Sequence, residues 1–161
     1  MIHHVYIGLG TNLGNKAQNL ATALRALQMR SIALLECSAF YGSKPWGFES
    51  DNDFLNAVAL MQTTYSPLDL LEQTQAVERE MGRTHKSVDG HYADRVIDID
   101  ILLYDDLQIH LPAEAGQHGA LTIPHPLMTK RDFVMRPLCE IAPSLIIPGQ
   151  TLKVEQLVSA L

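Results

Sequence analysis

The chain has few of the residues that build disulfide or zinc frameworks. Only two of its 161 residues are cysteine, Cys37 and Cys139. They are too few for a disulfide-stapled scaffold and have no metal-ligand spacing. We therefore interpret both as small buried hydrophobic residues and expect a reducing, cytoplasmic setting.

Long apolar runs and a broad basic surface are also missing. No apolar stretch approaches the ~20 residues that cross a bilayer, and no basic segment precedes an apolar run at the amino terminus. We therefore expect neither membrane insertion nor export. The formal net charge is -6, which argues against a general nucleic-acid binder. The basic residues form two local groups, which suit a compact anion: Arg79, Arg83, Lys86 and Arg95 in one, and Lys130, Arg131 and Arg136 in the other.

The sequence also lacks a Gly-x-x-x-x-Gly-Lys-Ser/Thr loop. The segment Gly8-Leu-Gly-Thr-Asn-Leu-Gly14 resembles a dinucleotide fingerprint, but its third glycine comes one residue late. We give that resemblance little weight, because the sheet expected here is antiparallel. A bound nucleotide would then be held by arginine, histidine and metal.

The most informative feature that is present is the pair Asp98 and Asp100 within Arg95-Val-Ile-Asp-Ile-Asp-Ile-Leu-Leu-Tyr104. Side chains alternate along a strand, so both acids point to the same face. Like charges side by side repel and lose hydration, and a divalent cation relieves both costs. For an Asp-x-Asp alone, an edge strand with one solvated face is the competing interpretation. The neighbouring residues favour a magnesium site.

These neighbours are polar residues near the acid pair. Gln75 and Glu78 share one face of an expected helix, and Arg83 follows the end of that helix. If Arg95 lies in the loop before the strand, its guanidinium can turn over the metal and bind phosphate oxygens in pairs. If the strand is already regular there, Arg95 and Asp98 lie on opposite faces. Singly, each is more often a solvated charge, but together they indicate a phosphate clamp.

The order of the expected elements indicates the fold class. We predict strands at residues 5–9, 32–41, 54–63 and 95–104, and helices at 16–29 and 67–81, with Ser66 as N-cap and Gly82 as terminator. The loop at 43–53 is too short for a crossover helix, so its strands are antiparallel. The β-α-β-β-α-β order predicts an α+β fold: a four-stranded antiparallel sheet with two helices on one face. We further expect a helix near 130–141, a short strand near 145–147 and a terminal helix, all in a single domain spanning residues 1–161.

Several motifs together resemble one known family. They are Gly8-Leu-Gly-Thr-Asn-Leu-Gly14, Lys44-Pro-Trp-Gly47, Asp53-Phe-Leu-Asn-Ala57, Gln75-Ala-Val-Glu-Arg-Glu-Met-Gly-Arg83, Arg95 to Leu103, Ile123-Pro-His-Pro126, Arg131-Asp-Phe133 and Arg136-Pro-Leu. In this order they resemble the 6-hydroxymethyl-7,8-dihydropterin pyrophosphokinases of folate biosynthesis. The resemblance implies a ferredoxin-like βαββαβ core and transfer of pyrophosphate from ATP to the hydroxymethyl group of a reduced pterin, which leaves AMP. Composition and spacing alone indicate only a magnesium-nucleotide enzyme.

The resemblance also implies roles for individual residues. Asp98 and Asp100 would bind two Mg²⁺ ions that bridge the triphosphate, and attack would fall on the β-phosphorus. Asp98 would also face the pterin. Arg83 and Arg95 would be catalytic cations that close over the phosphates. The implied ATP-binding set is Gln75, Glu78, Arg83, Arg95, the Ile101 backbone, Thr122, His125 and Arg131.

For the pterin, the resemblance implies two stacking rings, Phe54 and Phe133, with Asn56 reading the polar edge of the heterocycle. A wall formed largely by backbone groups would come from Ser43, Pro45 and Trp46. Singly, a phenylalanine is more often a core residue, Trp46 could anchor a loop, and His125 could cap the turn next to it.

The chain departs from the family pattern at a few positions. Phe54 replaces the usual tyrosine, Tyr92-Ala-Asp94 replaces Trp-Gly-Pro, and Pro126 stands where some members have tyrosine. The segment at 110–120 is expanded. We expect a monomer that binds ATP and a reduced pterin. Two other hypotheses remain open at this point: a non-catalytic ligand-sensing module on the same core, and a magnesium-nucleotide transferase for an unrelated alcohol.

Overall fold

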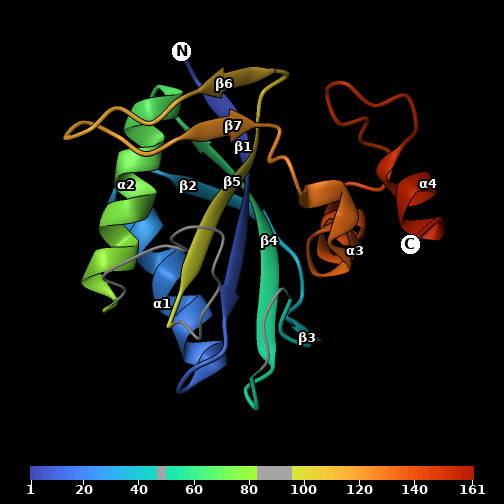
Figure 1. Cartoon of the computed structure of the whole chain (residues 1–161), viewed down its shortest axis with the longest axis horizontal. Helices are drawn as coiled ribbons and strands as arrows, with labels where there is room; N and C mark the ends of the chain where they lie inside the picture. Colours follow the sequence, from blue (N-terminus) through green and yellow to red (C-terminus); the bar gives the residue numbers. More distant parts are fainter. Residues whose placement is uncertain (47–49, 83–95) are drawn as a thin grey trace.

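The computed structural model describes residues 1–46, 50–82 and 96–161, and Figure 1 shows how the elements are arranged. In chain order they are β1 (His3–Thr11), α1 (Lys16–Met29), β2 (Ala33–Cys37), β3 (Tyr41–Ser43), β4 (Phe54–Thr63), α2 (Pro67–Glu80), β5 (Asp98–Tyr104), β6 (Ile109–Leu111), β7 (Leu121–Ile123), the 3-10 helix η1 (Met128–Lys130), α3 (Asp132–Ile141) and α4 (Val154–Ser159). In the described ranges, no helix is long and apolar enough to cross a membrane.

The central sheet is antiparallel and has the strand order β2-β4-β1-β5, with the short β3 also paired to β4. The elements β1, α1, β2, β4, α2 and β5 follow the expected βαββαβ order, so the ferredoxin-like α+β prediction is confirmed. Strand β1 lies between β4 and β5, and β5 forms one edge of the sheet.

Capping residues in the sequence determine where α1 and α2 begin and where α2 ends. Helix α1 begins at Asn15, whose side-chain oxygen accepts a hydrogen bond from the Gln18 N–H. Helix α2 begins at Ser66, whose hydroxyl accepts from the Asp69 N–H at 3.2 Å. It ends before Gly82, whose φ of +96° is a conformation that glycine adopts without steric cost. The predicted bounds of both helices are confirmed to within a residue.

Both faces of the sheet are covered. Alternate apolar residues of β1, such as Ile7 and Leu9, pack with α1 and α2 in one buried cluster. On the opposite face, Val58 and Leu102 pack with α3 and α4 in a second cluster. Figure 1 shows these two helix pairs on opposite sides of the strands. The prediction of two helices on one face is confirmed for α1 and α2, and α3 forms a further layer.

Three sequence predictions are wrong. The expected strand at 32–41 is two strands, because Ser38 bonds Val58 and the pairing with β4 is interrupted before Tyr41. Residues 145–147 are not a strand, because they lie in the loop between α3 and α4, where the Leu145 carbonyl accepts from the Val154 N–H. The two cysteines are half-buried rather than buried, since Cys37 ends an edge strand and Cys139 lies near the end of α3.

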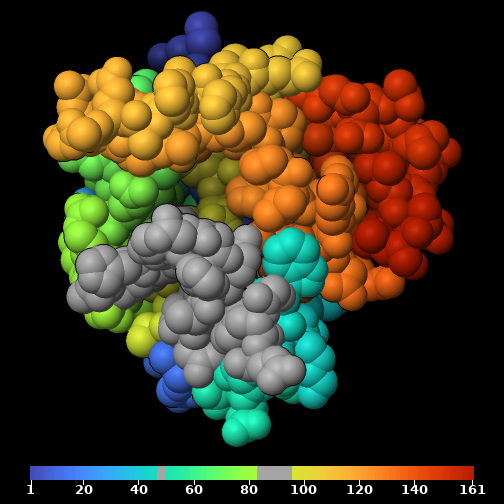
Figure 2. Space-filling view, viewed as in Figure 1, coloured from blue at the N-terminus to red at the C-terminus, as the bar shows by residue number. Residues whose placement is uncertain are grey.

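The expanded segment after β5 forms a two-stranded ribbon that the sequence reading did not predict. Strands β6 and β7 pair antiparallel, and Glu114 and His118 form an isolated bridge in the connection between them. Figure 2 shows this yellow-to-orange segment lying along the top of the molecule, from above α2 toward the red C-terminal segment.

The carboxylate of Asp105, just after β5, bonds two residues at the start of β1. Asp105 Oδ2 lies 2.7 Å from His3 Nδ1, and Oδ1 accepts from the His4 N–H at 2.8 Å. Burial raises the pKa of the Asp105 carboxyl, but the hydrogen bonds from His3 and His4 and the charges of these histidines lower it more, so the net pKa is lowered.

We expect Asp105→Asn to reduce the free energy of unfolding by about 0.5 to 1 kcal/mol near pH 6, as for other partly exposed pairs. Asparagine tolerates the φ of +47° at this position, so the backbone is kept. A carboxyl with a lowered pKa stabilises the fold above its unfolded pKa of about 3.9, and the effect is lost as the pH falls through the folded pKa. Urea unfolding at several pH values should show the two proteins converging on acidification. Asp106→Asn is the control, and a gap that persists at about pH 2.5 would contradict the assignment.

Candidate active site

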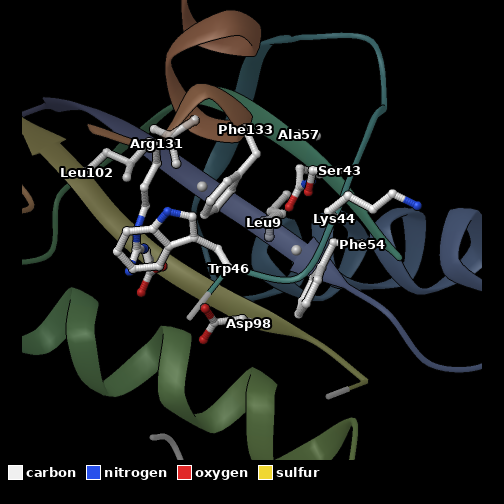
Figure 3. Close-up of a pocket in the computed structure, with 15 residues that line it drawn as sticks. Leu9, Ser43, Lys44, Trp46, Phe54, Ala57, Asp98, Leu102, Arg131 and Phe133 are labelled. Carbon is white, nitrogen blue, oxygen red and sulfur yellow. The ribbon is translucent and has the colours of Figure 1, made fainter. Parts of the chain in front are cut away.

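A pocket opens on the sheet face opposite α1 and α2, where β1, β4 and β5 meet α3 and the segment after β3. It contains about 620 Å³ of space, part of which is open to solvent. Figure 3 shows side chains that reach it from several elements. The lining residues are Gly8, Leu9, Gly10, Ser43, Lys44, Trp46, Phe54, Asn56, Ala57, Asp98, Asp100, Leu102, Arg131, Phe133 and Val134.

The floor of the pocket is formed by two glycines within β1 and by the acids beside them. Gly8 pairs with Asp100 and Gly10 with Asp98 across the β1–β5 ladder. A Cβ on Gly10 would lie 3.1 Å from Asn56 Oδ1, and a Cβ on Gly8 would lie 3.3 Å from the Leu102 side chain. Larger residues at positions 8 and 10 would therefore crowd the pocket floor.

Asp98 and Asp100 point to the same face and both line the pocket, as predicted. Both are half-buried. The alternative considered from the sequence was an edge strand with one solvated face. Strand β5 is indeed at the sheet edge, but the face that carries the two acids lies in the pocket rather than on an open surface. The pairing shifts register at Tyr6 and Ile7, which leaves Leu102 as an extra residue in β5. Bulges of this kind are common beside active sites.

A buried carboxylate on α2 fixes β5 between the two acids. Glu78 is only 2 % exposed, and its Oε2 accepts from the Ile99 N–H at 2.8 Å. Ile99 is the residue between Asp98 and Asp100, so Glu78 satisfies a backbone donor at the open edge of the sheet. The side chain predicted to line the nucleotide site thus also holds the strand of the acid pair.

The amide of Asn56 has a fixed orientation. Its Nδ2 donates to the Ser43 hydroxyl at 2.7 Å and to the Tyr41 carbonyl at 3.2 Å. A carbonyl can only accept, so the nitrogen must face Tyr41 and the oxygen must face the other way. Oδ1 is therefore on the side of Gly10, at the pocket floor. The site offers a hydrogen-bond acceptor at this position.

Arg131 lies in the pocket wall with its cation largely removed from solvent. It is 7 % exposed, and its guanidinium carbon lies 4.6 Å from the Trp46 ring centroid and 5.5 Å from that of Phe133. Within the described ranges, its Nε has no hydrogen-bond partner. Aromatic faces attract a cation but leave its N–H groups unsatisfied, so an anion that reaches Arg131 gains a strong partner.

Phe54 and Phe133 reach the same space from β4 and α3, and Trp46 lies over Arg131 (Figure 3). The Trp46 and Phe133 rings are 6.5 Å apart and tilted by 59°. The ammonium of Lys44 points away from the pocket and lies 3.1 Å from Asp53 Oδ2. Ser43 lines the pocket as predicted, whereas Pro45 does not.

Five described residues of the predicted nucleotide set lie outside this pocket, and the buried Glu78 is one of them. Gln75 lies beside Gly119 of the β6–β7 connection. The hydroxyl oxygen of Thr122 lies 2.7 Å from His110 Nδ1. The Ile101 side chain packs in the core on the other sheet face, so only its backbone remains for a ligand. His125 Nδ1 accepts from the Leu127 N–H at 3.2 Å, which is the turn-capping contact considered from the sequence.

The predicted catalytic cations Arg83 and Arg95, and the segment Tyr92-Ala-Asp94, lie outside the described residues. Of the described cations, Arg131 lines the pocket together with Lys44.

The donor set suits a magnesium ion that arrives with other ligands. Residues 1–46, 50–82 and 96–161 hold no cluster of three or more His, Cys, Asp or Glu side chains that could enclose a metal. Two carboxylates on one face leave most of an octahedral shell to waters and phosphate oxygens, which is how Mg²⁺ is commonly held beside nucleotides. The residues present therefore fit Mg²⁺ that is bound together with a phosphate compound.

Gly8 and Gly10 were not predicted to be parts of the site, and the strand predicted at residues 5–9 ended before Gly10, whereas β1 extends to Thr11. A signal was available: two glycines two residues apart inside a strand leave one face without side chains. Gly8 and Gly10 are in β1 itself, and β1 pairs antiparallel with both of its neighbours, as expected from the sequence.

Sequence comparison places the chain among known proteins. The family model for 7,8-dihydro-6-hydroxymethylpterin-pyrophosphokinase (HPPK) matches residues 6–143. A 2-amino-4-hydroxy-6-hydroxymethyldihydropteridine pyrophosphokinase of Porphyromonas gingivalis is 50 % identical over 141 residues, which cover 88 % of this chain and 92 % of the relative. The Haemophilus influenzae protein of the same name is 40 % identical over 151 residues, covering 93 % and 88 %.

Solved structures agree on the fold. The Plasmodium falciparum HPPK-DHPS wild type, solved with SDX-DHP, superposes with a TM-score of 0.80 at 15 % identity. The match covers 99 % of this chain and 44 % of that one, so the chain spans less than half the length of that neighbour. The family match over residues 6–143 and the two bacterial relatives show that the chain belongs to the 7,8-dihydro-6-hydroxymethylpterin-pyrophosphokinase family.

Proposed function

We propose that this chain transfers pyrophosphate from ATP to the hydroxymethyl group of 6-hydroxymethyl-7,8-dihydropterin and releases AMP, a step of folate biosynthesis. The observation that best supports the proposal is the composition of the pocket: paired acids on β5 face a space with aromatic rings and an oriented amide on its other side. A metal-bound triphosphate suits the first half, and a flat polar heterocycle suits the second.

Asp98 and Asp100 hold Mg²⁺, and we assign two ions to the pair. When bound, the metal neutralises charge on the phosphate chain and polarises the attacking hydroxyl. By binding the metal, the two carboxylates would determine where the phosphates lie, in line with the pterin hydroxyl for attack on the β-phosphorus. Phosphoryl-type transfer asks little covalent work of the protein, so alignment and charge account for most of the acceleration.

The nucleotide contacts come from both sides of the acid pair. Arg131 supplies a desolvated cation, and we assign the same phosphate role to His125, Arg83 and Arg95. Gln75, Glu78, Thr122 and the Ile101 backbone complete the proposed nucleotide site. The β6–β7 ribbon is part of this side, since Thr122 belongs to β7 and Gly119 adjoins Gln75.

The pterin lies between Phe54 and Phe133, with Asn56 at its polar edge. Asn56 Oδ1 can accept from N–H groups of the heterocycle, and Asp98 adjoins the hydroxymethyl end. We assign the remaining wall to the segment Ser43–Trp46, in which Ser43 and Trp46 line the pocket and Pro45 does not. Phe54 keeps the ring that stacking requires although it lacks the hydroxyl of a tyrosine.

We further propose that residues 1–161 act as one domain, as a monomer and in the cytoplasm. Its two cysteines are unpaired thiols, which suits a reducing compartment.

The reaction can be tested by its products. We expect the purified protein, given ATP, Mg²⁺ and 6-hydroxymethyl-7,8-dihydropterin, to form AMP and the pterin diphosphate in equal amounts, as resolved by anion-exchange chromatography. Formation of ADP would indicate a transferase of one phosphoryl group and contradict the proposal. Pterin binding without turnover would indicate a non-catalytic ligand-sensing module.

The metal assignment can be tested at Asp98. We expect Asp98→Asn to lower kcat by a factor of about 100 to 1000, or about 3 to 4 kcal/mol, which is typical for the loss of one charge-stabilising group. The melting temperature should be unchanged or higher, since one of two repelling charges is removed. Asp106→Asn, just beyond β5, is the matched control. Normal Mn²⁺ binding by Asp98→Asn in the presence of a non-hydrolysable ATP analogue would contradict the assignment.

The role of Glu78 at the strand edge gives a separate prediction. Glu78→Ala leaves the Ile99 N–H without its acceptor, which we expect to cost about 1 to 3 kcal/mol of unfolding free energy and to speed amide hydrogen exchange at Ile99. Glu78→Gln keeps a carbonyl acceptor and should retain most of the protection. The control is Glu72→Ala, an exposed position on the same helix. Unaltered exchange at Ile99 in Glu78→Ala would show that this hydrogen bond does not hold β5.

A further inference from the structure

Glu140 lies near the end of α3, is exposed, and is not among the residues that line the pocket. Its carboxylate nevertheless bonds the chain within the break between β2 and β3, at Ala39, and at Tyr41, the first residue of β3. Oε1 and Oε2 each lie 3.1 Å from the Ala39 N–H, and Oε1 also accepts from the Tyr41 hydroxyl.

The break between β2 and β3 explains why these contacts matter. Ser38 is the last residue of this segment bonded to β4 before the interruption: its N–H donates to the Val58 carbonyl and its hydroxyl accepts from the Val58 N–H. The next N–H, of Ala39, is turned toward α3. A backbone donor without a strand partner needs another acceptor, and a carboxylate is a strong one. Pairing with β4 resumes at Tyr41.

The Glu140 carboxylate also affects two nearby titratable groups, Tyr41 and Cys37. The hydrogen bond to Glu140 raises the pKa of the Tyr41 hydroxyl, and burial and the charge of Glu140 add to the effect. Burial raises the pKa of the Cys37 thiol, and the charge of Glu140 raises it further. Glu140 therefore faces both the end of β2 and the start of β3.

Tyr41 connects this carboxylate to the pocket. Its hydroxyl bonds Glu140, while its backbone carbonyl accepts from Asn56 Nδ2, which also donates to Ser43. Tyr41 pairs with Asn56 and Ser43 pairs with Phe54 across the β3–β4 ladder. Both acceptors that orient the Asn56 amide thus lie on a strand of three residues. So short a strand needs support from outside its own ladder.

We propose that Glu140 is a positioning residue for the pterin half of the site. By holding Ala39 and Tyr41, it keeps β3 in place, so that Asn56 directs Oδ1 into the pocket. The inference rests on the proposed contact between Asn56 and the pterin. It concerns the pterin and not the nucleotide, because Tyr41, Ser43 and Asn56 lie across the sheet from β5.

The test separates the two substrates. We expect Glu140→Ala to raise the KM for the pterin about 5- to 10-fold, as for loss of a charge-assisted contact of partial exposure, while the KM for ATP and kcat change less than about twofold. Glu140→Gln keeps a carbonyl acceptor and should stay within about twofold of the parent protein in both KM values. Tyr41→Phe, which loses only the hydroxyl, should fall between them.

A spectroscopic measurement reports on the orientation itself. In a ¹⁵N–¹H spectrum of the free protein, the side-chain amide of Asn56 should shift or broaden in Glu140→Ala and remain as in the parent protein in Glu140→Gln. Glu155→Ala, which removes an exposed glutamate from α4, is the matched control and should alter neither this signal nor either KM.

Two further results determine how the outcome is read. Asn56→Ala tests the proposed pterin contact directly: if its pterin KM is normal, that assignment fails and the inference fails with it. If Asn56→Ala is impaired and a folded Glu140→Ala is not, the pterin site stands and the positioning role is wrong. Equal increases in the KM for pterin and for ATP would indicate general destabilisation and would also overturn the proposal.

Discussion

The register between β1 and β5 is the constraint on which the site depends. It places Gly8 opposite Asp100 and Gly10 opposite Asp98, so the acids stand over a floor without side chains. A slip by one residue would turn Ile99 toward the pocket and both carboxylates into the apolar core. Because the apolar face of β5 must be buried in the core, Asp98 and Asp100 must face the pocket. The extra residue Leu102 then lets the strand pack under α3 without losing that alignment.

The charges of the pocket are separated, and this separation suits two unlike ligands. Asp98 and Asp100 concentrate negative charge at the sheet edge, and Glu78 lies buried behind them at Ile99. Such an arrangement is stable only while cations or solvent reach the acids. On the β4 side, the Asn56 amide is neutral and fixed by hydrogen bonds, and the Lys44 ammonium points away from the pocket toward Asp53. A polyanion that brings bound metal ions gains most at the first side, and a flat neutral ligand gains most at the second.

The sequence predicts well what local chemistry determines. Alternation along β5 was sufficient to place both aspartates on one face, and Ser66-Pro67 with Gly82 was sufficient to bound α2. Features that depend on a distant partner were not predictable. The break after Ser38 requires Val58 and α3, residues 145–147 have an apolar pattern without a neighbouring strand, and the β6–β7 ribbon lies in a polar, expanded segment.

Helix α3 connects the two sides of the pocket. Arg131 and Phe133 flank its first residue, so one helix end provides both a cation and an aromatic ring. Its buried face, with Met135 and Leu138, fixes the helix against β4 and β5, and its other end bonds the β2–β3 break through Glu140. A helix of ten residues spans about 15 Å, so α3 reaches from the wall of the pocket to the break between β2 and β3. The motif Arg131-Asp-Phe133 is therefore only one part of what α3 contributes, and the residues at its far end matter for the same geometric reason.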